Sequence, residues 1–375
     1  MNNTTNIINS GNTYDIIIEN VRRNLSMSQE TPKYSKSEIN QAGKIITKQN
    51  STPEETDHAL EILNNWRASH AYPLQVITSN LRRNVPDSIV VQRLKRLESI
   101  TGKIHRYPTM KLSKMQDLGG CRVIVNSIDE VYAALNRYKN SSIRHILKKE
   151  NDYIQNPKKS GYRSYHAIYQ FQSDKNDIYN DMCIEIQLRT KLQHMWGTAI
   201  ETMGVYTNTD LKSGQGEAYM LRFFTLASSL FAIAEGTPIC PDTPTDTEGL
   251  IAEIIEINKQ HNIISKLMTT NTLIDIDDDE TNKHNSKNAY YLLISDHKVH
   301  FTNIRSFKKS ELKIATESYA EMEKIYGTTK DIVLVSADSI SSLKAAYPNY
   351  LSDVKGFVAK LKEIIGQETW NEEFC

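Results

Sequence analysis

Hydrophobic positions change their period several times along the chain, and these changes predict an α+β fold. Apolar residues recur at helical spacing over 36–67 and again over about 74–106, which predicts helices in both stretches. Between 115 and 190 the pattern becomes short β-rich runs, CRVIV, AIYQFQ and CIEIQLR, with a helical pattern over 128–138. Further helical patterns occupy 190–203, 217–234 and 250–268. We therefore expect a mixed sheet flanked by helices.

An acid-rich segment divides the chain into two predicted domains. Residues 275–288, DIDDDETNKHNSKN, have no apolar periodicity, which is typical of an exposed linker. Residues 36–274 before it form the predicted main domain, and 289–375 after it follow a β-α-β-α pattern suited to a small α/β domain. The polar, Asn-rich start predicts a partly disordered arm over 1–35.

Composition places the chain among globular proteins. Hydrophobic residues make up 39% and charged residues 24%, and no window approaches the roughly 18 apolar residues of a membrane span. The first residues lack the pattern of a secretory signal, so we expect a cytoplasmic protein without a membrane partner. The four cysteines include no C-x-x-C pair, which argues against a thiolate zinc site. Composition leaves the oligomeric state open.

A formal net charge of zero conceals a local excess of positive charge. Between residues 82 and 122 there are ten Lys or Arg and three Asp or Glu. If 74–106 is helical, Lys95, Ser99 and Lys103 share one face, with Arg93 near its edge. Such a stripe can hold a polyphosphate, although a solvated basic helix face is the alternative.

Two carboxylates stand next to predicted strands. Asp117, in MQDLGGCRVIV, precedes a buried strand and is followed by two glycines, which suits Mg²⁺ binding against a phosphate as well as a simple turn. In CIEIQLR, period two places Glu185, Gln187 and Arg189 on one face, either as an active-site row or as the polar side of an amphipathic strand. If Asp117 and Glu185 lie on neighbouring strands, they provide the paired carboxylates of metal-assisted phosphoryl-type transfer.

The segment DYIQNPKKSGYRSYHAIY combines cations with aromatic rings. Gly161 marks a loop, and Tyr162 beside it offers a ring on which a base can stack, although loop tyrosines are common. Neither G-x-x-x-x-G-K-[ST] nor G-x-G-x-x-G occurs in the chain, so a nucleotide site must rely on side-chain cations and a metal.

Taken in order, RLKRLESITGK, MQDLGGCRVIV, DYIQNPKKSGYRSYHAIY and EIQLRTKLQHMW resemble the synthetase domain of the RelA/SpoT family of nucleotide pyrophosphokinases. The resemblance implies a five-stranded mixed sheet flanked by helices, similar to nucleotidyltransferases. It also implies an EC 2.7.6-type diphosphotransferase that uses Mg²⁺, moves the β,γ-pyrophosphate of ATP to a 3′-hydroxyl and releases AMP.

The matching positions imply three groups of site residues. Those implied to bind ATP are Arg93, Lys95, Ser99, Lys103 and Arg122. Those implied to be catalytic and to hold the metal are Asp117 and Glu185. Those implied to bind the acceptor are Tyr162, His166, Gln187 and Arg189.

Two features narrow the subtype. Long bifunctional members carry a hydrolase domain built around a His-Asp pair, and no His-Asp dipeptide occurs here, so the chain resembles synthesis-only members. The segment LVSADSISSLKAAYPNY is similar to the C-terminal region of CapRel-type fused toxin–antitoxin proteins, where a pseudo-zinc-finger domain covers the synthetase. Tyr347 and Tyr350 match the Tyr-x-x-Tyr element that occludes the ATP site in that subgroup until a phage protein binds, although Pro348-Asn349 also suits a β-turn.

Three functions therefore stand as alternatives. The first is an autoinhibited anti-phage toxin that pyrophosphorylates the 3′ CCA end of tRNA and blocks translation, with Arg82 and Arg83 contacting the tRNA acceptor end. The second is an alarmone synthetase that uses GDP or GTP as acceptor. The third is a nucleotide- or RNA-binding sensor without catalysis, against which the intact Asp117 and Glu185 argue.

Overall fold

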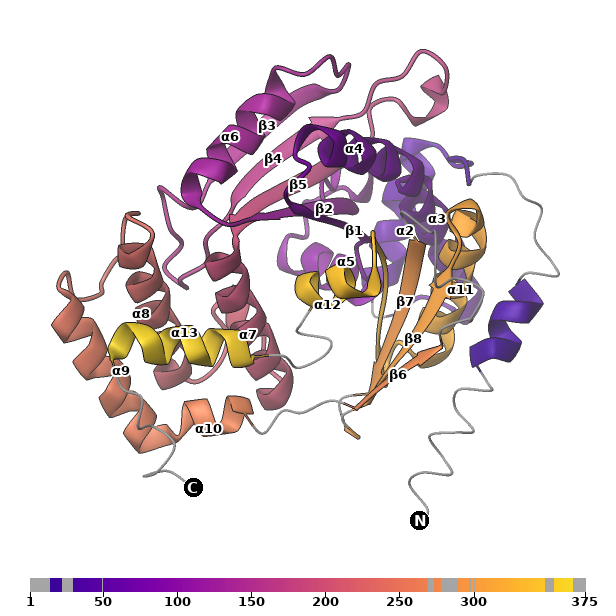
Figure 1. The fold of residues 1–375 in the computed structure, drawn as a ribbon. Coiled ribbons are helices and arrows are strands. Elements are labelled where there is room, and N and C mark those ends of the chain that lie inside the picture. The colour runs from indigo at the N-terminus through magenta and orange to yellow at the C-terminus, as the bar shows by residue number, and fades with distance from the viewer. Residues whose placement is uncertain are drawn as a thin grey trace.

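The computed structural model describes residues 14–21, 30–48, 50–268, 273–277, 289–296, 298–299, 301–347 and 354–366 (Figure 1). Several predicted features lie outside the described residues, namely most of the N-terminal arm, linker residues 278–288, and Tyr350 of the Tyr-x-x-Tyr element. Residues 14–21 of the predicted arm are helical. No helix in the described part is long and apolar enough to cross a membrane.

One mixed sheet of nine strands, ordered β3-β4-β5-β2-β1-β9-β7-β8-β6, organises the described part of the chain. The strands are β1 (Ile89–Leu94), β2 (Gly119–Val125), β3 (Ile146–Asp152), β4 (Tyr165–Gln170), β5 (Cys183–Thr190), β6 (Leu273–Asp277), β7 (Ala289–Asp296), β8 (Phe301–Phe307) and β9 (Asp331–Ala337). β2 pairs with β5 in parallel and β6 with β8 in parallel, whereas the other neighbours are antiparallel. The α+β class and the mixed sheet are confirmed.

The sheet is larger than the five strands predicted. The five strands between residues 89 and 190 are adjacent, but β1 also pairs with β9 at Gln92–Ser336 and Arg93–Val335. The sheet therefore continues into the four C-terminal strands. The β-α-β-α pattern predicted beyond 289 missed β8.

Helices surround the sheet. They are α2 (Lys36–Thr47), α3 (Pro53–Ser69), α4 (Ala71–Asn84), α5 (Leu97–Arg106), α6 (Ile128–Lys139), α7 (Lys191–Thr207), α8 (Ala218–Ala234), α9 (Thr247–His261), α10 (Ile263–Met268), α11 (Leu312–Tyr326), α12 (Ile340–Ala346) and α13 (Lys355–Ile365). Ser35 and Thr52 start α2 and α3 with capping boxes, in which their hydroxyls accept from the backbone N–H of Glu38 and Glu55.

The predicted continuous helix over 74–106 is wrong, because β1 interrupts it between α4 and α5. β1 is nearly buried on both faces, so its residues IVVQRL show no clean alternation, and its apolar positions imitate a helical repeat. The predicted stripe of Lys95, Ser99 and Lys103 on one helix is therefore also wrong. Arg93 lies on the strand, Lys95 on the connection, and only Ser99 and Lys103 on α5.

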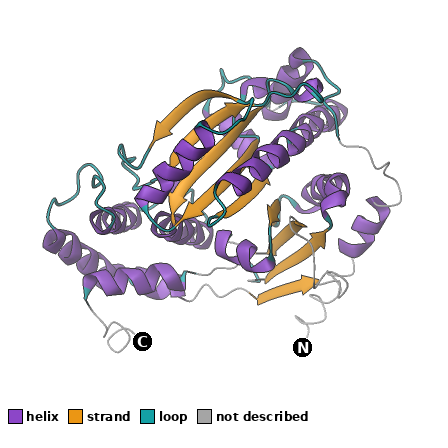
Figure 2. Cartoon of the chain, turned by 45° about the horizontal axis from the view of Figure 1, so that its top comes forward, coloured by secondary structure: helices purple, strands orange, loops and turns teal. Residues whose placement is uncertain are grey.

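Helices pack against the sheet (Figure 2), and each face of the sheet has its own apolar layer. On one face, α4, α6 and α11 bury side chains such as Leu74, Leu135 and Met322 against the strands. On the other face, Leu343, Ala346 and Tyr347 at the end of α12 pack in a separate cluster that includes Val91. We call the described residues from 289 onward the C-terminal segment. This segment thus covers part of the sheet face on which Glu185, Gln187 and Arg189 of β5 also lie.

Ion pairs and aromatic contacts fasten the C-terminal segment to earlier elements. Glu323 on α11 pairs with buried Arg67 on α3 and accepts the backbone N–H of Leu97 at 3.0 Å. Asp331 pairs with Arg96, and Asp338 pairs with Arg82 at 3.0 Å. A further contact is made by α13, which packs against α8 (Figure 1). The Phe357 ring lies 6.0 Å from that of Phe224 and 5.6 Å from that of Phe231.

Candidate active site

The register of the central strands assembles a polar surface on one face of the sheet. On β5, Ile184, Ile186 and Leu188 are buried on the opposite face, so Glu185, Gln187 and Arg189 share the other face. In the parallel pair, Glu185 lies opposite Gly120 of β2, and Gln187 lies opposite Arg122. Because Gly120 has no side chain, open space remains beside Glu185, and the nearest atom to an added Cβ there is the Glu185 carbonyl oxygen at 3.8 Å.

Asp117 lies two residues before β2 and is held by two lysines from different elements. Its Oδ2 accepts from Lys103 Nζ at 2.9 Å and pairs with Lys95 Nζ at 3.1 Å. The Lys95 N–H donates to the Leu118 carbonyl at 2.8 Å, which fixes the connection between β1 and α5 beside Asp117. Burial lowers the pKa of Lys95, and the charge of Asp117 opposes that effect.

Glu185 belongs to a chain of hydrogen bonds. Its Oε1 lies 3.0 Å from His166 Nδ1, and its Oε2 accepts from Gln187 Nε2 at 2.7 Å. The other ring nitrogen of His166 lies 2.7 Å from the Tyr162 hydroxyl. Burial acts to raise the pKa of Glu185, but His166, Gln187 and Lys95 together outweigh it, and the pKa falls to about 2. Glu185 is therefore a carboxylate at neutral pH.

Tyr162 is mostly buried rather than exposed on a loop surface. Only 6% of the residue is exposed, and Lys158 Nζ and Lys212 Nζ each lie 5.2 Å from the ring centroid. Burial raises the pKa of Tyr162 to about 12, so the hydroxyl keeps its proton and can donate to His166.

A cavity of about 90 Å³ lies between the two carboxylates. Its lining residues are Arg93, Lys95, Asp117, Gly120, Cys121, Arg122, Glu185, Gln187 and Tyr347. One acid from each side of the β2–β5 pair, Asp117 and Glu185, therefore shares a cavity with three cationic side chains. This arrangement suits the binding of a metal-bound polyphosphate.

The carboxylates fit a Mg²⁺ ion. Oδ1 of Asp117 is buried without a hydrogen-bond partner, although Oδ2 of the same group contacts two lysines. No cluster of three or more His, Cys, Asp or Glu side chains placed for a metal occurs in the described ranges. Mg²⁺ commonly uses one or two protein carboxylates and completes its shell with phosphates and water, so two acids suffice.

Residues from the C-terminal segment reach into this site. Tyr347 is 3% exposed, lines the cavity, and donates its hydroxyl to the Gln92 carbonyl at 3.3 Å. Arg122 lies 5.9 Å from the Tyr347 ring centroid and donates to the Ala346 carbonyl at 3.2 Å. The Ala345 carbonyl lies 2.9 Å from Nε2 of His194 on α7. The Tyr347 side chain thus fills space in the cavity that Asp117 and Glu185 line. The carbonyls of Ala345 and Ala346 use hydrogen-bonding groups of His194 and Arg122.

The two arginines predicted to contact tRNA lie apart from the cavity lining. Arg82 pairs with Asp338 and donates to the Val90 carbonyl at 2.9 Å, so the C-terminal segment engages its guanidinium. Arg83 is exposed near the end of α4 and bonds Asn80.

Next to the Tyr162 ring the structure adds Lys212 and its partner Glu201, which the sequence did not single out, beside the predicted Arg189. Lys212, from the turn after α7, pairs with Glu201 of that helix. Burial lowers the pKa of Lys212 to about 8 despite the Glu201 charge. Burial and the nearby Arg122 lower the pKa of Arg189 to about 9. The only sequence signal for Lys212 is a cation in a Gly-rich turn, which is too common to predict such a position.

Comparison with known proteins identifies the region that holds this site. Residues 92–210 match the family described as "Region found in RelA / SpoT proteins". GTP pyrophosphokinase YwaC of Bacillus subtilis is 31% identical over 124 residues, which cover 32% of this chain and 59% of that relative. A GTP pyrophosphokinase of Haemophilus influenzae is 30% identical over 118 residues, covering 32% of this chain and 15% of that relative. The chain therefore spans less than two thirds of the length of these relatives.

A solved structure of the small alarmone synthetase 1 from Bacillus subtilis, bound to its product pppGpp, aligns with 22% identity and a TM-score of 0.37. That alignment covers 44% of this chain and 90% of the other. Residues 92–210, the stretch that matches the family region, contain all the predicted site residues except Arg82, Arg83, Tyr347 and Tyr350.

Proposed function

We propose that the RelA/SpoT region of this chain transfers the β,γ-pyrophosphate of ATP to the 3′-hydroxyl of a ribonucleotide acceptor. The observation that carries the proposal is the shared cavity of Asp117 and Glu185, supplied from the two sides of a parallel strand pair and surrounded by Arg93, Lys95 and Arg122. The relatives named as GTP pyrophosphokinases support the same class of reaction.

On the donor side, cations bind and orient the polyphosphate. Arg93, Lys95 and Arg122 line the cavity, and Lys103 reaches its edge through Asp117. Ser99 lies one helical turn before Lys103 on α5, from where its hydroxyl is proposed to bind ATP. Asp117 and Glu185 would hold Mg²⁺, which when bound offsets the negative charge that builds up on the transferring phosphates. The fixed cations stabilise the same charge without reorganisation.

On the acceptor side, Glu185 is proposed to receive the proton of the attacking hydroxyl. The 3′-oxygen forms a bond to the β-phosphorus, the bond from that phosphorus to the α–β bridging oxygen breaks, and AMP leaves. His166 orients Glu185, and Tyr162 orients His166, through the 3.0 and 2.7 Å contacts described above. Gln187 and Arg189 continue the row along β5 and are proposed to position the acceptor.

For the acceptor we propose the 3′ CCA end of tRNA, with Arg83 near the approach and Arg82 after its release from Asp338. This choice rests on the CapRel-type resemblance of the C-terminal segment. GDP or GTP is the second candidate, favoured by the names of the relatives. Both acceptors present a stacked purine ribonucleotide with a 3′-hydroxyl.

The C-terminal segment is proposed to restrain this activity. Tyr347 fills one wall of the cavity, and the carbonyls of Ala345 and Ala346 contact His194 and Arg122. A substrate phosphate would compete with the Ala346 carbonyl for the Arg122 guanidinium. A phage protein that binds the C-terminal segment is the proposed trigger for release, in the setting of anti-phage defence.

The acceptor is tested with ATP labelled at the γ-phosphate. The label is followed into total tRNA, GDP and GTP in parallel reactions, with the full chain and with a Tyr347→Ala variant. Label on tRNA that is lost after removal of the 3′-terminal adenosine supports the first candidate. Label only in guanosine nucleotides replaces it with the second. No transfer to any acceptor with either protein contradicts the proposed reaction.

A further inference from the structure

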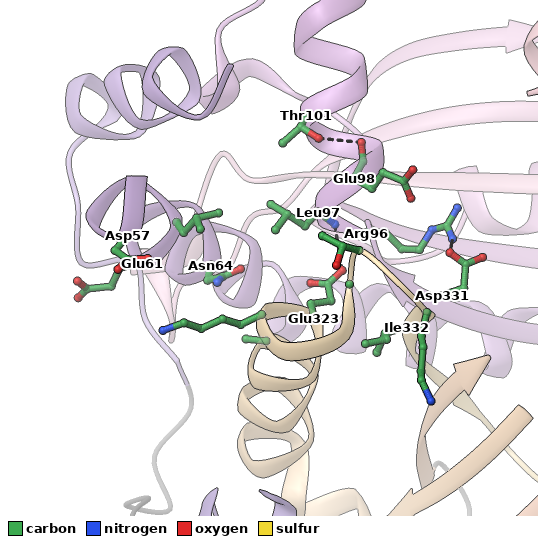
Figure 3. A pocket seen from close by; sticks show the side chains of 16 residues that line it. Asp57, Glu61, Asn64, Arg96, Leu97, Glu98, Thr101, Glu323, Asp331 and Ile332 are labelled. Atoms are coloured by element: carbon green, nitrogen blue, oxygen red, sulfur yellow. Dashed lines mark hydrogen bonds and ion pairs between the residues drawn. The ribbon is translucent and has the colours of Figure 1, made fainter. Parts of the chain in front are cut away.

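A second cavity lies at the seam between the N-terminal helices and the C-terminal segment, with a volume of about 670 Å³. Figure 3 shows Asp57, Glu61 and Asn64 of α3 on one side, Glu323, Asp331 and Ile332 of the C-terminal segment on the other, and Leu97 of α5 between them. It shares no lining residue with the active-site cavity. We call it the seam cavity.

The seam cavity combines an apolar wall with an excess of negative charge. Leu60, Leu97, Ala320 and Ile332 provide the wall. Five carboxylates and three cationic side chains line the cavity.

The Arg, Lys, Asp and Glu partners outside the lining leave this excess unchanged. Glu323 pairs with Arg67, and Lys330 pairs with Asp296 at 3.5 Å, so one permanently charged partner of each sign is added, while Glu61 also lies 3.6 Å from the imidazole of His58. The carbonyl end of α11, near Gly327, adds partial negative charge.

We propose that the seam cavity binds an organic cation with an apolar body, and that this ligand holds α11 and β9 against α3 and α5. The volume lies within the roughly 300–1,000 Å³ of small-molecule sites, and the lining offers both an apolar surface and a complementary charge. A ligand that touches both sides of the seam binds only when the two sides are together. By linkage it therefore stabilises the joined arrangement by RT ln(1 + L/Kd), where L is the ligand concentration, and this term grows with the logarithm of L once L exceeds Kd.

Three probes with one body and different charges test the ligand class: 4-phenylbutylammonium, 4-phenylbutanol and 4-phenylbutyrate. Binding to the full chain is measured by titration calorimetry. We expect the ammonium to bind at least fivefold more tightly than the alcohol, and the carboxylate to bind more weakly than the alcohol at this cavity. The active-site cavity, lined by Arg93, Lys95 and Arg122, disfavours the cationic probe, so that probe reports on the seam.

Variants locate the binding. Ala320→Phe fills the cavity and is expected to weaken ammonium binding at least tenfold. Asp57→Asn combined with Glu98→Gln keeps the apolar wall and is expected to reduce the preference for ammonium over alcohol to below twofold. Glu54→Gln is the matched control, because Glu54 is an exposed acid on the same helix α3 that does not line the cavity, and it should leave binding unchanged.

Hydrogen exchange tests the effect on the seam. Saturating ammonium is expected to slow exchange of the β9 amides, residues 331–337, in the wild type. Equal affinity for all three probes, undiminished binding by a folded Ala320→Phe variant, or unchanged exchange in β9 would each overturn the proposal. If Ala320→Phe does not fold, the double variant and its Glu54→Gln control still decide it.

Discussion

Replacement of Tyr347 by alanine should both loosen the C-terminal segment and raise activity. The ring is 3% exposed and packs in the apolar cluster with Val91 and Leu343. Truncation of a buried aromatic residue to alanine costs about 3–5 kcal/mol, because transfer free energy is lost and a cavity remains. The hydroxyl donates to the Gln92 carbonyl, a neutral hydrogen bond of about 1 kcal/mol. Tyr347→Phe should therefore cost only about 1 kcal/mol.

The stability difference sets the expected gain in activity. If about 3 kcal/mol of ring packing is lost only from the occluded arrangement, the ratio of open to occluded molecules rises by about 150-fold. Activity then rises by up to that factor, until most molecules are open. Tyr347→Phe, which keeps the ring, should raise activity by less than tenfold.

The assay follows AMP release from ATP with a saturating acceptor, beside urea unfolding of each protein. Tyr206→Ala is a suitable control, because Tyr206 is 51% exposed and does not line the cavity. A folded Tyr347→Ala protein with wild-type or lower activity would refute occlusion by this ring. Truncation near residue 275 is also predicted to raise toxicity. Point variants are nevertheless the better test, because truncation removes β9 and leaves the edge of β1 unpaired.

Further predictions concern stability. Glu323→Ala leaves Arg67 buried without its partner and should lower the free energy of unfolding by about 3–5 kcal/mol in urea titrations. Lys212→Met leaves Glu201 unpaired and should cost about 1–3 kcal/mol in the same measurement, much of it recovered when Glu201→Leu is added. Burial lowers the pKa of His70 to about 4, so the unfolded chain binds more protons between about pH 6.5 and 4. Wild-type stability should therefore fall by up to about 3 kcal/mol more than that of His70→Asn as the pH drops through this window, as thermal unfolding at each pH would show.

The sequence predicted the parts of the site that depend on local pattern. Alternation over 183–189 placed Glu185, Gln187 and Arg189 on one face of β5, as the structure shows. The position of Asp117 just before a strand could also be read from the sequence, because the residues CRVIV that follow the two glycines form a short β-rich run, which is buried in β2.

Features that depend on long-range packing escaped prediction. β1 is buried on both faces, so its pattern imitated a helix, and Lys95 and Lys103 meet at Asp117 across a strand-to-helix connection rather than along one helix face. The pairing of β1 with β9 joins residues about 240 apart in the chain, and no local signal specifies such a pair. Lys212 reaches Glu201 only because the turn after α7 folds back onto that helix.

The proposed reaction requires that the chemistry takes place at the cavity between Asp117 and Glu185. The most direct measurement is the yield of AMP per modified acceptor, made with the wild type, Asp117→Asn, Glu185→Gln, and Asp129→Asn as an exposed control. We predict one AMP for each pyrophosphorylated acceptor, a rate loss of at least about 100-fold in each of the two site variants, and a wild-type rate for the control. Formation of ADP instead of AMP, or wild-type rates in both site variants, would contradict pyrophosphate transfer at this site.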